Sequence, residues 1–357
     1  MAVLVSLILT GGVVAFAATV RIVLTFAPPP LCHTSEPAPL RSARVRSLEK
    51  STRSVLFLYG ERCTGDALVH ALRARGIQPV FRSSTHLAVG IDRNRPRIYE
   101  RITHRDLADF DLVQVYGSGH RPTGLVGALS CYLSARSSGL VNGNGLGTGN
   151  ALAAPSKLQQ YVELALAGES VPDSIHQASG DFDEFAGRLG TPFVVKPLYG
   201  RDGALTRLVH DAPAWAEVLR AVGDDRLAFI AQRFVPNNGT FVLLVLEDDV
   251  PVVVHRCSTD ASRITNRRSA SHDTLFDPET FDPEVKATAV RCATHFGYDV
   301  ATVTVVQDRV TRAWYVLGVN GQPALGEMPF AAKMSHAHAA YMDRLLRRDA
   351  SMAAGRR

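Results

Sequence analysis

Residues 192–203 have the sequence Pro-Phe-Val-Val-Lys-Pro-Leu-Tyr-Gly-Arg-Asp-Gly, a short run of strand formers followed by a turn with two glycines. Lys196 ends the strand, and Gly200 and Gly203 leave backbone N–H groups accessible in the turn. Seen alone, these features describe a solvated lysine and a tight hairpin. Together they place an ammonium group and backbone donors around one small volume, which predicts a site for phosphate oxygens.

The segments after this stretch alternate between strand and helix patterns. The segment Asp282–Phe296 is amphipathic, with Val285, Ala289 and Cys292 on one face. The other expected elements are a strand at Thr206–Val209 that pairs with the first, a helix at Ala214–Val222, strands at Leu227–Val235, Phe241–Leu246, Pro251–Arg256, Ala301–Gln307 and Ala313–Val319, and a closing helix at Ala331–Arg348.

The residues before this stretch predict an open α/β layer. A strand at Val55–Leu58 leads through a glycine turn into a helix that stops at Gly76. Further strands are expected at Pro79–Arg82, His86–Ile91, Asp111–Tyr116 and Gly139–Asn142, with a helix at Gly124–Ser137. A third helix is expected from about Ser156, its N-cap, to Ala167, ending at Gly168.

The bulk properties favour a globular protein with two or three subdomains, since the chain has 357 residues and 46% of them are hydrophobic. The net charge of +5 comes from basic residues scattered along the chain, and no aromatic stacking platform accompanies them. We therefore expect no nucleic-acid partner. Five widely spaced cysteines indicate reduced thiols in a cytoplasmic setting.

Most of the N-terminal residues 1–27 are apolar, and Arg21 is the main exception. Residues 2–20 form a stretch long enough to span a bilayer. Three interpretations stay open. The segment is a membrane anchor that leaves the rest in the cytoplasm, a weakly supported secretory signal, or an addition from a mis-called start codon. Residues 28–52 are rich in Pro, Ser and Arg and are expected to be a linker.

Several segments, in order, resemble the ATP-grasp superfamily, and most closely its RimK-type and glutathione-synthetase-like carboxylate-amine ligases. The resemblance covers about residues 55–325. It rests on Leu140-Val-Asn142, Ser156-Lys-Leu-Gln-Gln-Tyr161, the 192–203 stretch, Phe229-Ile-Ala-Gln-Arg-Phe-Val235, and Tyr315-Val-Leu-Gly-Val-Asn320. It implies an α/β ATP-grasp fold with an N-terminal open α/β pre-ATP-grasp domain.

The resemblance also implies roles for individual residues. Lys157, Lys196, Gly200 and Gly203 would contact ATP. Residues 232–235 would link the two lobes, with the backbone at Gln232, Phe234 and Val235 recognising adenine. Arg256 and Arg263 would contact the γ-phosphate and the acyl-phosphate, because a guanidinium is permanently charged. Asn266 and Asn320 would contribute to a Mg²⁺ site.

The sequence departs from the family at charged positions, including those that bind the metal. The positions of the family's metal carboxylates are occupied by Thr304 and Gly318, and Arg233 stands where a Glu is usual. Thr240 and Val242 likewise replace an Asp and an Arg. Mg²⁺ prefers carboxylate oxygens, so its binding is in doubt unless Asp260, Asp299 or Glu327 has taken over. 

The predicted organisation is an apolar segment (1–27), a linker (28–52), a pre-ATP-grasp domain (53–153), an ATP-grasp domain (154–331, lobes 154–231 and 236–331) and a C-terminal helix and tail (332–357). The first functional hypothesis is an ATP-dependent ligase that joins a small-molecule or peptide carboxylate to an amine through an acyl-phosphate. The second is a nucleotide-binding or scaffold module that has lost its metal ligands. The sequence does not indicate an oligomeric state.

Overall fold

The computed structural model describes residues 53–59, 66–93, 95–116, 123–136, 139–141, 155–177, 180–198, 206–223, 228–258, 271–321, 323 and 330–354. The apolar segment 1–27 and the linker 28–52 lie outside these ranges. So do the candidate site residues Gly200, Gly203, Arg263 and Asn266, and the acids Asp260 and Glu327. Within the described ranges, no helix is both long and apolar enough to cross a bilayer.

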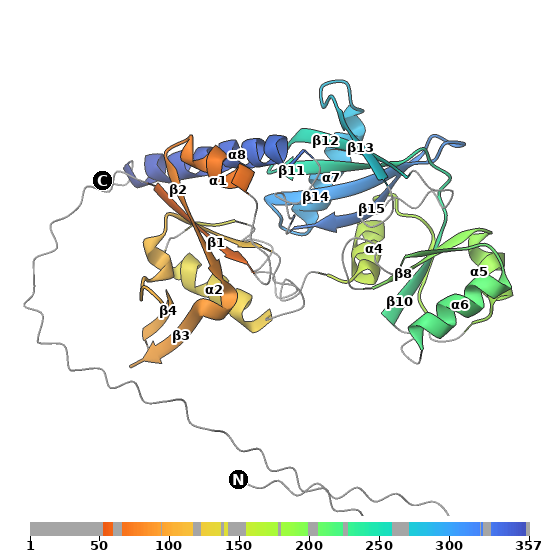
Figure 1. Ribbon diagram of the computed structural model, residues 1–357, viewed down its shortest axis with the longest axis horizontal. Coiled ribbons are helices and arrows are strands. Elements are labelled where there is room, and N and C mark those ends of the chain that lie inside the picture. Colours follow the sequence, from red (N-terminus) through yellow and green to blue (C-terminus); the bar gives the residue numbers. More distant parts are fainter. Residues whose placement is uncertain are drawn as a thin grey trace, which may run out of the picture. The chain divides into compact units, whose positions relative to one another are not determined.

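The first sheet is parallel and has the strand order β2-β1-β5-β6 (Figure 1). Its strands are β1 (Arg53–Tyr59), β2 (Ile77–Ser83), β5 (Leu112–Tyr116) and β6 (Gly139–Leu140), connected in part by α1 (Asp66–Arg73) and α2 (Thr123–Ala135). In β1, Val55 and Phe57 alternate with Leu56 and Leu58, so both faces of the strand are apolar. The sheet therefore has a separate core on each face, as expected for a parallel α/β layer.

An antiparallel hairpin of β3 (Leu87–Asp92) and β4 (Arg95–Glu100) follows β2. The sequence analysis missed β4, because its first residues, Arg95-Pro-Arg97, have a weak strand propensity. Two short 3₁₀ helices, Ser84–His86 and Leu107–Asp109, flank the hairpin. 

The second sheet is antiparallel and has the order β7-β10-β8-β9. It contains β7 (Ser174–Ile175), β8 (Phe193–Pro197), β9 (Arg207–Val209) and β10 (Phe229–Arg233), with helices α5 (Phe182–Leu189) and α6 (Ala212–Val222). Phe193 and Val195 pack in a core with α5 and α6. Lys196 follows Val195 and is on the opposite face, because side chains alternate along a strand. The expected hairpin of residues 192–209 is confirmed, whereas α5 and β7 were not predicted.

The helix α4 (Lys157–Leu166) lies against that opposite face. Its N-cap is Ser156, whose Oγ accepts the N–H of Gln159 at 3.1 Å, as the sequence predicted. Gly168 has φ of +82° where the chain leaves the helix. Tyr161 of α4 packs with Leu198 and Ile230 in a small buried cluster, which fixes the helix to β8 and β10. 

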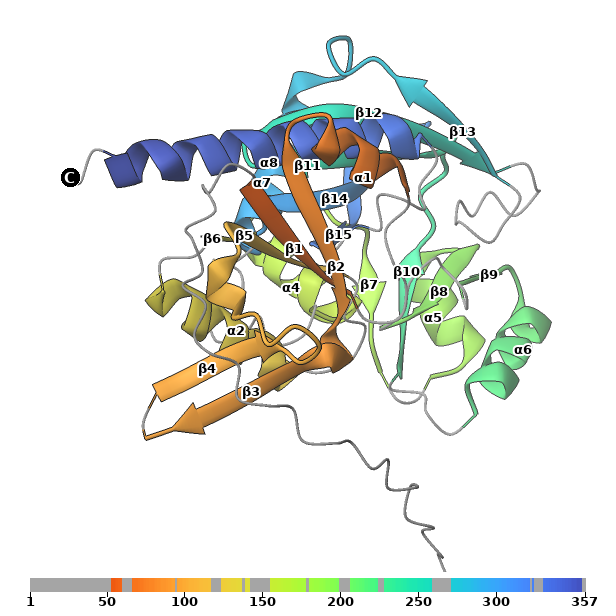
Figure 2. The same ribbon diagram turned by 60° about the vertical axis from the view of Figure 1, so that its left-hand side comes forward.

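The third sheet is antiparallel and has the order β13-β12-β11-β14-β15. It contains β11 (Thr240–Leu246), β12 (Asp249–Ser258), β13 (Ser271–Phe276), β14 (Val300–Gln307) and β15 (Trp314–Asn320). Leu243, Val245 and Val303 face α7 (Pro283–His295), and Val242, Leu244 and Leu246 face the other way. Figure 2 shows the sheet with α8 (Ala331–Ala354) running along it.

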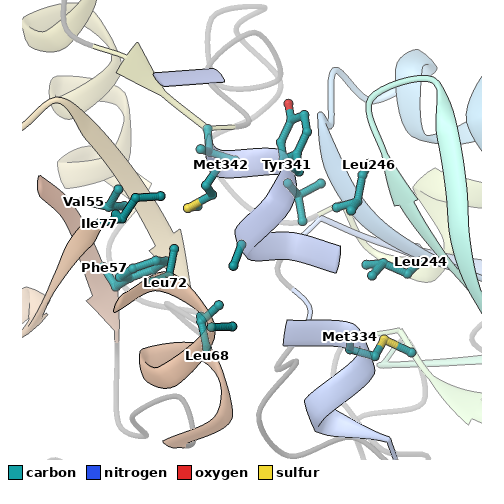
Figure 3. Packing of buried hydrophobic residues seen from close by; sticks show 14 of the residues in the cluster. Val55, Phe57, Leu68, Leu72, Ile77, Leu244, Leu246, Met334, Tyr341 and Met342 are labelled. Carbon is teal, nitrogen blue, oxygen red and sulfur yellow. The ribbon is translucent and has the colours of Figure 1, made fainter. Parts of the chain in front are cut away.

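The helix α8 is shared by the first and third sheets. Met334, Tyr341 and Met342 are fully buried with Val55, Phe57 and Leu68 on one side and Leu244 and Leu246 on the other, as Figure 3 shows. Two ion pairs continue this attachment: Arg53 to Asp343 at 2.6 Å and Arg348 to Glu247 at 2.8 Å.

The side chain of His338 is fully buried in α8, and burial lowers its pKa to about 3. His336, two residues earlier, is exposed. Because α8 packs against two sheets, the stripe of helix positions that solvent cannot reach is wide.

Candidate nucleotide-binding site

Two lysines define the candidate site. Lys196 leaves β8 on the face that carries Ile230, its cross-strand partner, and Gln232. Lys157 begins α4, and its backbone N–H donates to the carbonyl of Leu198, two residues beyond Lys196. The end of β8 and the start of α4 are therefore joined by the main chain, which brings the two lysine side chains together.

Burial lowers the pKa of both lysines. The side chain of Lys196 is buried, and this burial lowers its pKa to about 7. Lys157 is half-buried, and its pKa is lowered to about 8, first by burial and then by the charge of Lys196. Two ammonium groups that repel one another in a buried place are unfavourable in the free protein. A bound polyanion would offset this repulsion, so the pair fits a nucleotide triphosphate.

The Lys196 ammonium is held by Tyr161, a residue that the sequence analysis did not single out. Nζ of Lys196 donates to the Tyr161 hydroxyl at 2.6 Å and lies 5.0 Å from the ring centroid. The hydroxyl in turn donates to the carbonyl of Leu317 in β15 at 2.8 Å. A signal was present in the sequence, because Tyr161 is four residues after Lys157 and so lies on the same face of the helix.

Gln232 is buried beside these groups. Its Nε2 donates to the Oγ of Ser174 at 2.9 Å. Burial raises the pKa of the Tyr161 hydroxyl, and a hydrogen bond from the Gln232 amide opposes this rise. Gln232 is therefore next to the tyrosine that holds Lys196.

The segment between the second and third sheets begins at the end of β10. Phe234 is half-buried and Val235 is buried. The carbonyl of Val235 accepts from the Asn237 side chain at 2.8 Å, and Oδ1 of Asn237 accepts from the N–H of Gly239 at 2.9 Å. Asn237 thus fixes the turn into β11, a role that was not predicted.

Arg233, which stands where the family has a Glu, has partners of its own. It pairs with Asp173 at 3.1 Å and with Asp308 at 3.9 Å, and its guanidinium lies 5.1 Å from the centroid of the Tyr315 ring. These contacts explain how a cation is accommodated at that position. 

Arg256 is buried in β12 and forms a bidentate pair with Asp273 of β13. Nε donates at 2.9 Å and Nη2 at 3.0 Å to the two carboxylate oxygens, and Nη1 is outside this pair. The two residues are directly opposite in the strand register. Asp273 was not predicted, because it lies 17 positions after Arg256 in the chain and nothing in the sequence joins the two.

The three positions aligned with the family's metal ligands, Thr304, Gly318 and Asn320, share one face of the third sheet. Thr304 is opposite Gly318, and Thr302 is opposite Asn320. Thr240 and Arg256, also opposite one another, are on the same face by the alternation along β11 and β14. The register therefore places Arg256 and Asn320 on the same sheet face.

No group of three or more His, Cys, Asp or Glu side chains with metal-binding geometry occurs among the described residues. Asn320 is exposed at the end of β15, and its neighbours Thr304 and Gly318 supply no carboxylate. The carbonyl of Asp299 accepts from the N–H of Glu247, and the Asp299 charge acts on Tyr341 of α8. Within the described part of the chain, a Mg²⁺ ion at Asn320 would therefore have no carboxylate ligand from Thr304 or Gly318.

The topology of three sheets, with a lysine pair at the junction of the second and third, defines the class: this is an ATP-grasp fold. Residues 161–340 match the RimK-like ATP-grasp domain, which is just over half of the chain. The protein therefore belongs to the RimK-like ATP-grasp family, whose members are ATP-binding ligases. Lys157 lies just before the matched residues.

Similar solved structures support the fold. The ATP-grasp ligase PsnB, complexed with a minimal precursor, has a TM-score of 0.61 at 17% identity, over 80% of this chain and 98% of PsnB. D-alanine–D-alanine ligase from Bacillus anthracis, complexed with ATP, has 0.57 at 15%, over 86% and 99%. A RimK domain ATP-grasp protein from Sphaerobacter thermophilus has 0.52 at 20%, over 81% and 99%. No curated protein sequence matches the chain.

Proposed function

We propose that the protein is an ATP-dependent carboxylate-amine ligase, with ATP bound at Lys157 and Lys196. The observation that carries this proposal is the convergence of buried Lys196 and half-buried Lys157, whose pKa values are both lowered. The charge of Lys196 acts on Lys157, so the two ammonium groups repel one another. A ligand with several negative charges would offset this repulsion.

In the proposed reaction, a carboxylate oxygen attacks the γ-phosphorus of ATP and the bond to the bridging oxygen breaks, so that ADP leaves. An amine then attacks the acyl carbon, loses a proton and displaces phosphate to form an amide or peptide bond. Lys157 and Lys196 would stabilise charge on the phosphates, and Arg256 would contribute from the third sheet. Gly200, Gly203, Arg263 and Asn266 keep their proposed roles in the binding loops. 

The adenine would be recognised by the backbone at residues 232–235, with Phe234 and Val235 packing on the ring. Asn320 is the described residue proposed to contact Mg²⁺ carried by ATP. PsnB was solved with a precursor peptide, and D-alanine–D-alanine ligase is a ligase of small molecules. We therefore propose a small-molecule or peptide carboxylate as the acid, and no nucleic acid as a partner.

The domain boundaries predicted from the sequence are retained in this proposal. Residues 53–153 would form the pre-ATP-grasp domain and residues 154–331 the ATP-grasp domain. The reaction would take place in the cytoplasm, either free or at a membrane to which residues 2–27 anchor the chain.

The test is release of ADP and phosphate by the full chain with ATP, Mg²⁺ and a panel of acids and amines. Calorimetric titration with ATP, with and without Mg²⁺, accompanies it. Product release that requires both acid and amine would support the ligase. Absence of ATP binding would contradict it.

A second function is favoured by one specific observation: Thr304 and Gly318 stand opposite one another where the family has carboxylates. In that case the protein is a nucleotide-binding or scaffold module without turnover. It would bind ATP with little dependence on Mg²⁺ and would release no ADP with any acid and amine in the panel.

A further inference from the structure

Two consecutive residues of α4 contact β15 on either side of Gly318. Tyr161 donates its hydroxyl proton to the carbonyl of Leu317, and Oε1 of Gln160 accepts the backbone N–H of Val319 at 2.9 Å. Nε2 of Gln160 donates to the carbonyl of Pro155 at 3.1 Å, just before the helix. The start of α4 is thereby held to one point of β15.

That point is an irregularity in the sheet. Thr304 pairs with Gly318 and Val305 with Val316, so Leu317 has no partner of its own in the register with β14. A bulge of this kind turns one residue out of the regular ladder. The Leu317 carbonyl would otherwise need a donor in a partly buried place, and the Tyr161 hydroxyl provides it.

The same hydroxyl accepts a hydrogen bond from Lys196. A phenol has one proton to donate and can accept at its oxygen, so both contacts are satisfied at once. An ammonium group has three N–H donors. One is directed to Tyr161, which fixes the orientation in which the other two can meet a phosphate.

We propose that Tyr161 is a positioning residue of the nucleotide site, which holds the Lys196 ammonium at a fixed place relative to the β15 bulge beside Gly318. The proposal rests on the proposed function, because it assigns ATP to Lys196. Its consequence is that the hydroxyl stabilises the charged form of Lys196, the form that binds phosphate. The tyrosine acts through the lysine and touches no reacting atom.

The experiment is to measure ATP affinity by calorimetry from pH 6 to pH 10 for the full-length protein and for Tyr161→Phe. The variant keeps the ring and its packing but removes the acceptor of the Lys196 hydrogen bond. We expect the pH at which affinity falls to move down by about one unit, with roughly tenfold weaker binding near pH 8. The matched control is Tyr132→Phe, which loses a 2.7 Å hydrogen bond to Asp106 in the first α/β layer. It should lower the melting temperature and leave the midpoint pH unchanged.

If Tyr161→Phe does not fold, 3-fluorotyrosine at position 161 keeps the packing and weakens the oxygen as an acceptor. The midpoint should then move in the same direction by a smaller amount. Normal ATP binding with an unmoved midpoint in the folded variant would overturn this inference and leave the proposed function intact. A wild-type protein that binds no ATP would overturn both.

Discussion

The charge of Lys196 lowers the pKa of Lys157, although the two residues belong to different elements and are separated by about forty positions in the chain. Their proximity follows from one backbone hydrogen bond, from Lys157 N–H to the Leu198 carbonyl at 3.0 Å. This repulsion is maintained in the free protein by the packing of α4 on β8 and β10. It sets up the first two predictions.

Replacing either lysine with methionine should weaken ATP binding, and replacing Lys196 should also stabilise the folded protein. Lys196→Met and Lys157→Met should each weaken ATP binding by roughly 10- to 100-fold, because a charged donor to phosphate is lost. Lys196→Met should also raise the melting temperature, because it removes a buried charge. Calorimetry and thermal unfolding measure the two effects. Lys333→Met, at an exposed position in α8, is the control and should change neither.

Unchanged ATP affinity in the double variant Lys157→Met/Lys196→Met would remove the basis of the nucleotide site. Lower stability in Lys196→Met would show that the lysine is favourable where it is, contrary to the electrostatic argument.

Proton uptake should accompany ATP binding. The pKa values of about 7 and about 8 lie below the ordinary value of 10.5, so the unfolded chain holds more protons than the folded chain between these limits. The destabilisation by these lysines is therefore complete below about pH 7 and declines as the pH rises toward 10.5. Phosphate oxygens favour the charged lysines and raise both pKa values again. Calorimetry near pH 8 in buffers of different ionisation enthalpy should give a positive number of protons bound. A value of zero would contradict the prediction.

Removing either partner of the Arg256–Asp273 pair should greatly lower the free energy of unfolding. Both side chains are below 10% exposed, so Asp273→Asn or Arg256→Ala leaves a buried charge without its counterion. We expect a loss of about 3–5 kcal/mol in the free energy of unfolding, measured by denaturant titration. The control is the exposed pair Arg220–Glu217, where Glu217→Gln should cost less than about 1 kcal/mol. Similar small values for both pairs would argue against a buried pair.

Carboxylates introduced at Gly318 and Thr304 of the third sheet should make ATP affinity depend more strongly on Mg²⁺. A Cβ at Gly318 would lie 3.7 Å from Oε1 of Gln160, an ordinary contact, so Gly318→Glu is compatible with the backbone there. Its cross-strand partner is changed by Thr304→Asp. The double variant should bind ATP more tightly as Mg²⁺ is added, by a larger factor than the wild type. Gly318→Gln/Thr304→Asn is the uncharged control. Equal Mg²⁺ dependence in all three proteins would show that the metal is held elsewhere.

Gly239 should not tolerate a side chain. It has φ of +130°, and a Cβ would lie 2.6 Å from the Arg256 carbonyl oxygen and from Nε2 of His255. We expect Gly239→Ala to destabilise the protein by more than about 1 kcal/mol, since backbone atoms must move. Gly187→Ala is the control: it lies in α5 with nothing within 4 Å, and should stabilise the helix by about 0.5–1 kcal/mol. Thermal unfolding compares the two.

Much of the fold was predictable because local patterns agreed with it. The apolar runs in β8 and β11 and the Ser156 cap of α4 all appear in short stretches of sequence. The elements that were missed, β4, β7, α5 and β13, are short or begin with residues of weak propensity. Their place is decided by neighbouring strands and helices, which a linear pattern does not contain.

The site was predictable only in part. Lys157 and Lys196 stand out because each lies next to a recognisable element boundary. Tyr161, Asn237 and Asp273 act through contacts with residues distant in the sequence, so their partners emerge only from the strand register and helix packing.

The packing of α8 has a consequence for movement. Because Met334, Tyr341 and Met342 belong to a core made by the first and third sheets together, those two sheets can separate only by exposing it. The second sheet has its own core with α5 and α6, and touches the rest mainly through α4. In hydrogen exchange, the amides of β1, β11 and α8 should therefore open together. The amides of β8 to β10 should open independently of them.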